Sequence, residues 1–294
     1  MPESDVIIIG GGPAGVSAAL YTQRAGLSTK IITAGPGALE KAHAIENYYG
    51  LAVSGPELLR IGLAQAQGVG VEVLTAEVLD VMIQNKAESK AEKNMFIVET
   101  TVGSYCAQLV ILAAGTGRTK PKWPGLADFE GRGVSYCAAC DAFFHRGKDV
   151  AVAGSGAYAL HEAQALLPLV RSVTVCTDAA APEAPFPPEV RVITQPVVKL
   201  EGGELLTQIC FKDGSALPVS GLFVAMGTTG ALHFARNLGL ALQGDAIIVD
   251  AAMRTSVPGL FAAGDCTGGM KQIAKAVYEG AVAGTEAVGF FRTL

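Results

Sequence analysis

The feature that most constrains the fold is an apolar run followed directly by a glycine turn. Residues 5–9 are mainly β-branched and predict a buried parallel strand, and residues 10–15 read GGGPAG. Gly10, Gly12 and Gly15 match GxGxxG, and a helical segment follows. In this context the first glycine permits a sharp turn, the second lets a pyrophosphate approach the backbone, and the third lets helix and strand pack closely. We therefore predict that a dinucleotide binds at the N-terminus of the first helix.

A second turn of the same kind lies in the middle of the chain. The apolar residues 149–153 predict another buried strand, and residues 154–159 read GSGAYA, which matches GxGxxA. A helix to about residue 167 follows. The fold class predicted from the two turns is α/β, with two Rossmann-like dinucleotide-binding domains.

Composition limits the kinds of partner and the cellular compartment that we expect for this protein. A chain of 294 residues is long enough for two domains, and 50% apolar residues can form a large core. The net charge of −5 gives no reason to expect nucleic acid or an anionic membrane as a partner. Six cysteines in a chain of this length are not a secreted disulfide scaffold, and the N-terminus does not read as a signal peptide. We predict a cytoplasmic protein without a membrane span, because the longest uncharged stretch, residues 214–235, reads as strand and loop.

A pair of cysteines two residues apart is the clearest chemical feature. Residues 136–141 read YCAACD, so Cys137 and Cys140 can form a disulfide or open to two thiols, and Asp141 can carry protons. The same spacing is half of a zinc site, with His145 as the nearest further ligand. The other four cysteines are scattered singly, so we favour a redox pair and predict no metal site.

Several segments together carry a family resemblance. A generic dinucleotide fold has an acid about 20 residues after the last glycine, but the second strand here ends Ile-Thr-Ala-Gly at Gly35. That ending, together with the GGGPAG turn, IENYYG at residues 45–50, ILAAG at 111–115, GRGVS before the CxxC and GLFAAGDC at 259–266, resembles low-molecular-weight thioredoxin reductases. The resemblance runs nearly from end to end.

The resemblance implies that the first glycine turn holds FAD. It places Asn47 near the flavin, the backbone around Val78 at the adenine, Asp265 at the ribityl chain and phosphate, and Gln272 near the isoalloxazine. The full set of expected FAD-binding residues is Gly10, Gly12, Pro13, Ala14, Gly15, Gly35, Asn47, Val78, Ala113, Ala114, Gly115, Gly264, Asp265, Lys271, Gln272 and Ile273.

Two neighbouring positions have alternative readings. Asp265 could also be the N-cap of the last helix, expected from Gln272 to about Phe290. Cys266 is expected to be a small buried residue.

The family also implies a domain plan. The FAD domain is expected to be discontinuous, residues 1–116 and 240–294, with an NAD(P)H-type domain carrying the CxxC inserted at 117–239. A homodimer is expected by the same analogy. Within the first domain we expect an amphipathic helix at 56–67 and strands at 71–79, 96–101 and 109–113.

The resemblance assigns roles to the redox pair. Cys137 is expected to be the outer thiol that reacts with a disulfide of thioredoxin or a thioredoxin-like protein. Cys140 is expected to face the flavin, and Asp141 to manage protons. The direction of electron flow stays open, so electrons could also pass from a dithiol to the flavin. A flavin-binding redox sensor without turnover is a further alternative.

One region departs from the family pattern. The strand at 173–176 leads into Asp178, where the family has a His-Arg-Arg run that grips the 2′-phosphate of NADPH. Between residues 150 and 195, Arg171 and Arg191 are the only Lys or Arg residues. Four prolines among residues 182–188 exclude the helix expected there.

Three interpretations of the second fold follow. Asp178 could bind the ribose hydroxyls of NADH, NADPH could bind weakly in a changed pose, or the fold serves only as a scaffold for the CxxC. We favour the scaffold, with ferredoxin, a second flavin or another electron carrier as donor rather than NADPH. Tyr158, on the second turn, could stack on a flavin or plug an emptied cleft, and we favour the plug.

Overall fold

The computed structural model describes residues 3–35, 37–85, 94–115, 121–227 and 230–294. The chain divides into two compact units: unit 1 comprises residues 1–117 and 230–294, and unit 2 comprises residues 118–229. The first boundary, predicted at residue 116, lies outside the described residues.

The predicted return to unit 1 at residue 240 is ten residues too late. A short helix, α5 (Ala231–Asn237), already belongs to unit 1, because Leu232 and Phe234 are buried in its core.

Unit 1 is built on a seven-stranded sheet. Its strands are β1 (Glu3–Ile9), β2 (Thr29–Thr33), β3 (Glu72–Thr75), β4 (Val78–Asn85), β5 (Asn94–Thr100), β6 (Gly103–Leu112) and β17 (Leu260–Ala262). The order is β3-β2-β1-β6-β5-β4, with β17 beside the last residues of β6. The strands β3, β2, β1, β6 and β17 are parallel, whereas β4, β5 and β6 pair antiparallel.

The single strand predicted at 71–79 is wrong, because the chain changes partners at residues 76–77. β3 pairs with β2, and β4 then pairs with β5. Unit 1 also contains a two-stranded ribbon of β15 (Leu242–Gln243) and β16 (Ala246–Ile247).

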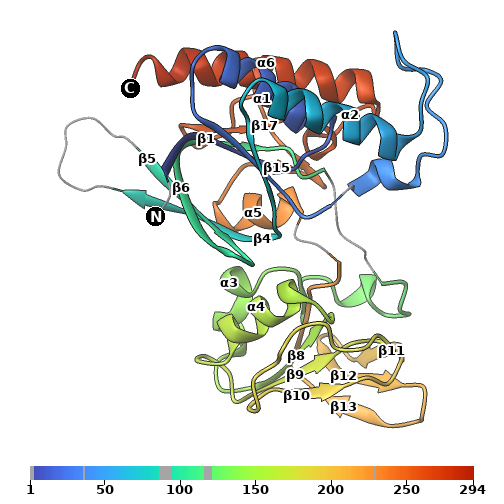
Figure 1. Cartoon of the computed structure of the whole chain (residues 1–294). Coiled ribbons are helices and arrows are strands. Elements are labelled where there is room, and N and C mark those ends of the chain that lie inside the picture. The colour runs from blue at the N-terminus through green and yellow to red at the C-terminus, as the bar shows by residue number, and fades with distance from the viewer. Residues whose placement is uncertain (1–2, 36, 86–93, 116–120, 228–229) are drawn as a thin grey trace. The chain divides into compact units, whose positions relative to one another are not determined.

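Helices cover both faces of this sheet (Figure 1). The helices α1 (Pro13–Arg24), α2 (Gly55–Gly68) and α6 (Ile273–Phe291) lie over one face, and α5 lies on the other. Side chains alternate along β1, so Val6 and Ile8 pack under α1 and α6 while Ile7 and Ile9 face the α5 side. Two 3₁₀ turns, η1 (Gly37–Lys41) and η4 (Asp265–Thr267), connect these elements.

The α1 and α6 helices pack closely because glycines face backbone. A β-carbon on Gly280 would lie 2.1 Å from the carbonyl oxygen of Ala14, and one on Gly284 would lie 2.6 Å from that of Ala18. The Ser17 hydroxyl also donates to the carbonyl of Val277 at 2.7 Å. Helix α6 thereby packs against the start of α1 and fixes the first glycine turn.

Unit 2 carries a parallel sheet and a small antiparallel meander. Its strands are β7 (Val134–Ser135), β8 (Asp149–Ala153), β9 (Ser172–Cys176), β10 (Arg191–Ile193), β11 (Val197–Gly202), β12 (Leu206–Phe211), β13 (Ala216–Pro218) and β14 (Gly221–Val224). The parallel order is β10-β9-β8-β14-β7, and β11-β12-β13 forms the meander.

The helical elements of unit 2 are α3 (Ala138–Asp141), α4 (Ala157–Leu166) and the 3₁₀ turns η2 (Ala127–Phe129) and η3 (Ala142–His145). Figure 1 shows α3 and α4 next to each other in unit 2.

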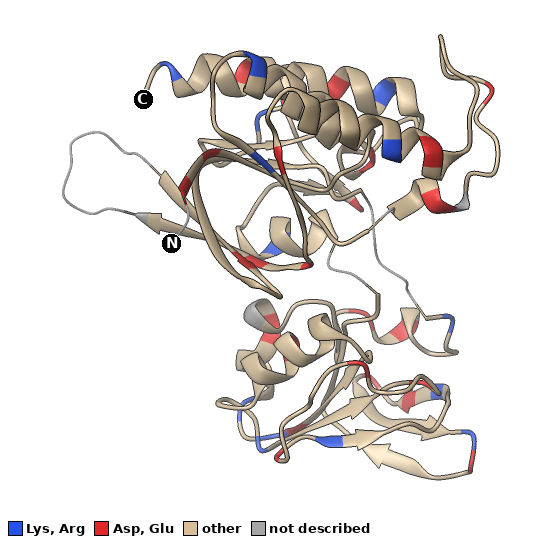
Figure 2. Cartoon of the chain, viewed as in Figure 1, with Lys and Arg blue, Asp and Glu red and all other residues tan. Residues whose placement is uncertain are grey.

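Figure 2 shows acidic and basic residues interspersed over both units rather than gathered by sign. None of the helices in the described part of the chain is both long and apolar enough to cross a membrane.

Candidate active site

The predicted cofactor residues of unit 1 gather at one edge of its sheet. Because β1, β2, β6 and β17 are parallel, the segments that follow them meet at their carboxyl ends. These segments are the first glycine turn, Gly35, residues 113–115 and Gly264-Asp265. Val78 opens β4 directly after the end of β3 and is only 5% exposed.

The first glycine turn is closely packed at Gly10 and Gly15 and open at Gly12. Gly10 has φ +112°, and a β-carbon there would lie 2.4 Å from the carbonyl oxygen of Ala113. A β-carbon on Gly15 would lie 1.9 Å from the carbonyl oxygen of Gly10, so turn and helix need both glycines. By contrast, apart from Gly12 and its two chain neighbours, no described residue has a heavy atom within 4 Å of the β-carbon position on Gly12. The surface of the turn that would face a pyrophosphate is therefore clear, and Pro13 starts α1 at its N1 position.

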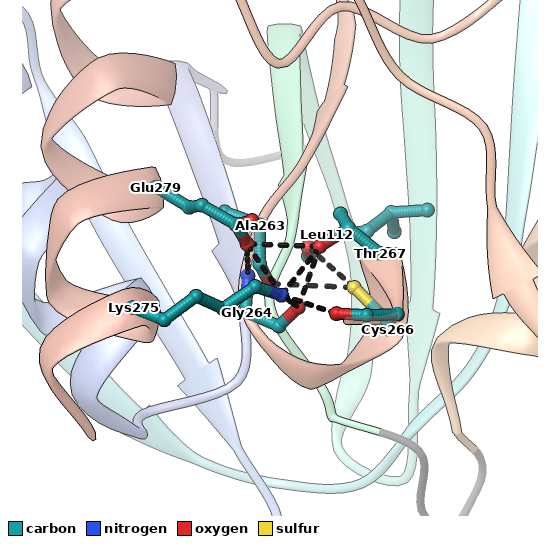
Figure 3. Close-up of polar contacts among 8 residues, drawn as sticks. Leu112, Ala263, Gly264, Cys266, Thr267, Lys275 and Glu279 are labelled. Atoms are coloured by element: carbon teal, nitrogen blue, oxygen red, sulfur yellow. Dashed lines mark hydrogen bonds and ion pairs between the residues drawn. The ribbon is translucent and has the colours of Figure 1, made fainter. Parts of the chain in front are cut away.

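The Gly264-Asp265 turn is held by a buried ion pair that the sequence analysis missed (Figure 3). Glu279 accepts the backbone N–H of Gly264 and the hydroxyl of Thr267, each at 2.8 Å. Lys275 lies 3.0 Å from the Glu279 carboxylate and donates to the carbonyls of Gly264 and Gly268 at 2.8 and 2.6 Å. An i, i+4 Lys–Glu pair in an otherwise Ala- and Gly-rich helix was the available signal.

Two expectations for this turn have definite outcomes. Asp265 is not the N-cap of the last helix, because α6 begins at Ile273 and its N-cap is Gln272. Cys266 is completely buried, as predicted, and burial raises the pKa of its thiol to about 12. It lies against the carbonyls of Leu112 and Ala263, within the network of Figure 3.

Two other predicted residues come together across 225 positions of sequence. The side-chain amide of Asn47 donates to the side-chain oxygen of Gln272 at 3.0 Å. Gln272 stands between Lys271 and Ile273, at the N-terminus of α6, so this contact ties the IENYYG segment to the start of the last helix.

The cysteine pair lies at the carboxyl end of a strand in unit 2. Cys137, the N-cap of α3, and Cys140, within α3, form a disulfide with their α-carbons 5.4 Å apart. Cys137 is 2% exposed, whereas Cys140 is exposed. The backbone N–H of Cys140 donates to the sulfur of Cys137 at 3.0 Å. A hydrogen bond to this sulfur favours its thiolate once the disulfide opens.

Asp141 reaches the pair through a serine. The Ser135 hydroxyl donates to the Asp141 carboxylate at 2.6 Å and accepts the backbone N–H of Cys137 at 3.1 Å. Asp141 is half-buried, and its own N–H donates to the carbonyl of Cys137 at 3.2 Å. The carboxylate and the hydroxyl thus hold the backbone at Cys137.

Helix α4, which follows the second glycine turn, holds the backbone on both sides of Cys137. Glu162, 3% exposed, accepts the N–H of Ala138 at 2.7 Å. One turn earlier, the Tyr158 hydroxyl donates to the carbonyl of Tyr136 at 3.4 Å. Tyr158 is 1% exposed and packs in the core with β8 and β9, so its ring is not open for stacking on a flavin, and the interpretation as a plug stays a prediction.

His145 and the neighbouring aromatic residues differ in accessibility. His145 contacts the Ser220 hydroxyl through Nδ1 at 3.1 Å and packs edge-on against Phe223, and burial, then Lys148, lowers the pKa of its imidazole. Phe143 and Phe144 are 71% and 69% exposed. A cavity of about 790 Å³ opens beside them, lined in part by Asp141, Phe144 and His145. The redox pair is therefore flanked by exposed apolar surface.

Asp178, the acid after β9, is engaged within unit 2. One carboxylate oxygen accepts the indole N–H of Trp123 at 3.2 Å, and the other accepts the backbone N–H of Val197 at 2.8 Å. Its backbone has φ +50°. The side chain thus ties the second fold to the meander and to Trp123, which is 8% exposed.

Comparison with known proteins shows the family to which the chain belongs. The family model for pyridine nucleotide-disulphide oxidoreductases matches residues 4–280. The chain belongs to this family. A thioredoxin reductase of Listeria monocytogenes is 33% identical over 314 residues, covering 99% of this chain and 94% of that protein.

Two solved structures of this oxidoreductase family are also similar. The atypical thioredoxin reductase TRi from Desulfovibrio vulgaris Hildenborough has a TM-score of 0.88 at 37% identity, and covers 98% of each chain. A ferredoxin-flavin thioredoxin reductase from Clostridium acetobutylicum has a TM-score of 0.74 at 31% identity over the full length of both chains. The chain is thus an FAD-dependent disulfide oxidoreductase of the thioredoxin reductase type, with two Rossmann-like domains.

The residues of unit 1 fit FAD. The space above Gly12 is clear, the helix dipole of α1 points at it, and no acid lies in the first turn of that helix. The turn of Gly264 and Asp265 is rigidly held, and Thr33 meets Gly35 through a hydroxyl-to-carbonyl hydrogen bond of 3.2 Å. FAD, when bound, supplies two-electron redox chemistry.

Proposed function

We propose that the protein exchanges electrons between bound FAD and the Cys137–Cys140 disulfide, and passes them on to thioredoxin or a thioredoxin-like protein. We further propose that its electron donor is ferredoxin, a second flavin or another electron carrier, and not NADPH. The observation that carries the donor proposal is the segment after β9, where Asp178 stands in place of a basic cluster.

The chemistry of the pair supports the first part. Opening the disulfide takes two electrons and two protons and yields the thiols of Cys137 and Cys140. Cys137, as a thiolate stabilised by the N–H of Cys140, attacks the partner's disulfide and forms a mixed disulfide. Cys140 then attacks the sulfur of Cys137, the disulfide closes again and the partner leaves as a dithiol, while Asp141, held by the Ser135 hydroxyl, exchanges protons with the pair. Cys137 must become accessible for this step, because it is 2% exposed.

The electrostatics of the second fold support the donor proposal. A 2′-phosphate needs a guanidinium or ammonium partner, and the carboxylate of Asp178 would repel it. Both oxygens of Asp178 already accept hydrogen bonds from Trp123 and Val197, which also disfavours a grip on the ribose of NADH. The similarity to a protein named as a ferredoxin-flavin thioredoxin reductase points to the same class of donor.

The decisive experiment titrates the holoenzyme anaerobically with NADPH, NADH and reduced ferredoxin in turn. Flavin bleaching is followed at visible wavelengths, and new thiols are alkylated at pH 8 and assigned by mass spectrometry. We expect ferredoxin to bleach the flavin and to release the thiols of Cys137 and Cys140. Rapid stoichiometric bleaching by NADPH would contradict the donor proposal. A disulfide that stays closed after flavin reduction would contradict the whole scheme.

A further inference from the structure

The two glycine turns of this chain share a backbone geometry but not an environment. Gly12 caps α1 at φ −74° and ψ −175°, and Gly156 caps α4 at φ −101° and ψ −166°. Each is the second glycine of its motif, where a dinucleotide pyrophosphate approaches the backbone. Beyond its chain neighbours, the β-carbon position on Gly12 has no described atom within 4 Å, whereas a carboxylate oxygen of Glu183 lies 3.5 Å from the β-carbon position on Gly156.

The carboxylate is brought there by the proline-rich segment, residues 180–188, which we call the strap. The backbone N–H groups of Glu183 and Ala184 donate to the carbonyl of Ser155 at 2.8 and 3.1 Å. Ser155 is the middle residue of the turn itself. Before Glu183, the Thr177 hydroxyl donates to the carbonyl of Ala180 at 2.6 Å, and after it Phe186 packs against the core of unit 2, so the strap is anchored on both sides of Glu183. Prolines also reduce the number of conformations that the strap can adopt.

The carboxylate of Glu183 is exposed to solvent and accepts no hydrogen bond from the described residues, so a ligand at this turn would meet its charge and the space that it takes. The N-terminus of α4, a ten-residue helix, carries a partial positive charge and outward-facing N–H groups that favour an anion. We propose that Glu183, placed beside Gly156 by the strap, is the residue that excludes an external pyrophosphate from the second glycine turn. Charge repulsion and occupied space act together, because both anions need the same few ångströms above Gly156.

This inference rests on the proposed function for its biological meaning, but its test does not. The probe is ADP-ribose, which carries a pyrophosphate and transfers no electrons. Binding is measured by isothermal titration calorimetry on the FAD-loaded holoenzyme, so that the first site is already filled. The variants are Glu183→Gln, which removes the charge and keeps both backbone hydrogen bonds to Ser155, and Glu183→Ala, which also clears the space. Glu189→Gln, an exposed carboxylate just past the strap, is the matched control.

We expect both Glu183 variants to bind ADP-ribose at least tenfold more tightly than the wild type, with the alanine variant the tighter, and the Glu189 variant to match the wild type. Wild-type protein that binds as tightly as the variants, or variants that gain nothing, would overturn the inference. Unchanged melting temperatures and flavin content confirm that each variant is folded. Because ADP-ribose cannot reduce the flavin, a negative binding result would not contradict the proposed disulfide chemistry. If the disulfide chemistry proved wrong, the binding result could still be interpreted.

Discussion

The ion pair behind the Gly264-Asp265 turn permits a quantitative prediction. Lys275 and Glu279 retain 15% and 12% of their side-chain exposure, and between them they hold three backbone groups of the turn. Removing one partner of a buried pair costs about 3–5 kcal/mol, because the other charge is left uncompensated. For Lys275→Met we expect a loss of about 3 kcal/mol in the free energy of unfolding, at the lower end of this range because some exposure remains.

The cost should appear in cofactor affinity as well as in stability. Urea unfolding gives the free energy of the apoprotein, and quenching of FAD fluorescence gives the dissociation constant. We expect Lys275→Met to weaken FAD binding at least tenfold, because Asp265 sits in the turn that the lysine fixes. A second variant, Lys275→Met with Glu279→Leu, removes both charges and should regain part of the stability. It should not regain FAD affinity, because the N–H of Gly264 then lacks its carboxylate.

A matched control lies on the same helix. Arg254 and Glu286 form an exposed pair, with 50% and 36% of their side chains accessible. Glu286→Gln should cost less than about 1 kcal/mol and leave FAD binding unchanged. The reasoning is refuted if Lys275→Met costs no more than this control, or if FAD affinity survives the loss of the lysine.

Three further predictions concern unit 2 and the thiols. Glu162→Ala should lower the free energy of unfolding by about 2 kcal/mol and slow disulfide reduction. Glu162→Gln should largely retain both properties, because an amide oxygen can accept the same backbone N–H. An equal effect of the two variants, in urea unfolding and stopped-flow traces, would contradict this positioning role. Replacing Phe143 and Phe144 by serine should raise KM for a thioredoxin substrate about tenfold with little change in melting temperature, because both rings are exposed; an unchanged KM places docking elsewhere. Burial raises the pKa of Cys176 and Cys266 to about 12, so native protein should not be alkylated there at pH 8, and labelling of either by mass spectrometry would show that these thiols are accessible.

Local sequence patterns were sufficient for the elements that carry the chemistry. The strands before both glycine turns, the helices after them, and the position of the CxxC all follow from short-range periodicity and turn chemistry. The helix predicted at 56–67 is present as α2, where Ser54 caps its N-terminus. The disulfide of Cys137 and Cys140 agrees with the redox interpretation of the spacing.

The parts that sequence could not supply depend on residues far apart in the chain. Helix α5 is too short to show a clear period, and it becomes helical by packing against the sheet of unit 1. Glu279 reads as an ordinary helix residue until the Gly264 turn is placed beside it. The location of Glu183 over Gly156 is likewise a consequence of the path of the strap, since nothing in the local pattern distinguishes this acid from Glu189.

The shared strand β6 has a consequence for the order in which the protein matures. Its first half pairs with β5, made just before it, but its last residues pair with β17, which is synthesised about 150 residues later. Unit 2 is a continuous segment and is fully translated before β17 and α6 exist. On the ribosome, the domain bearing the cysteine pair can therefore fold first, and flavin capture must wait until β17 and α6 have been made.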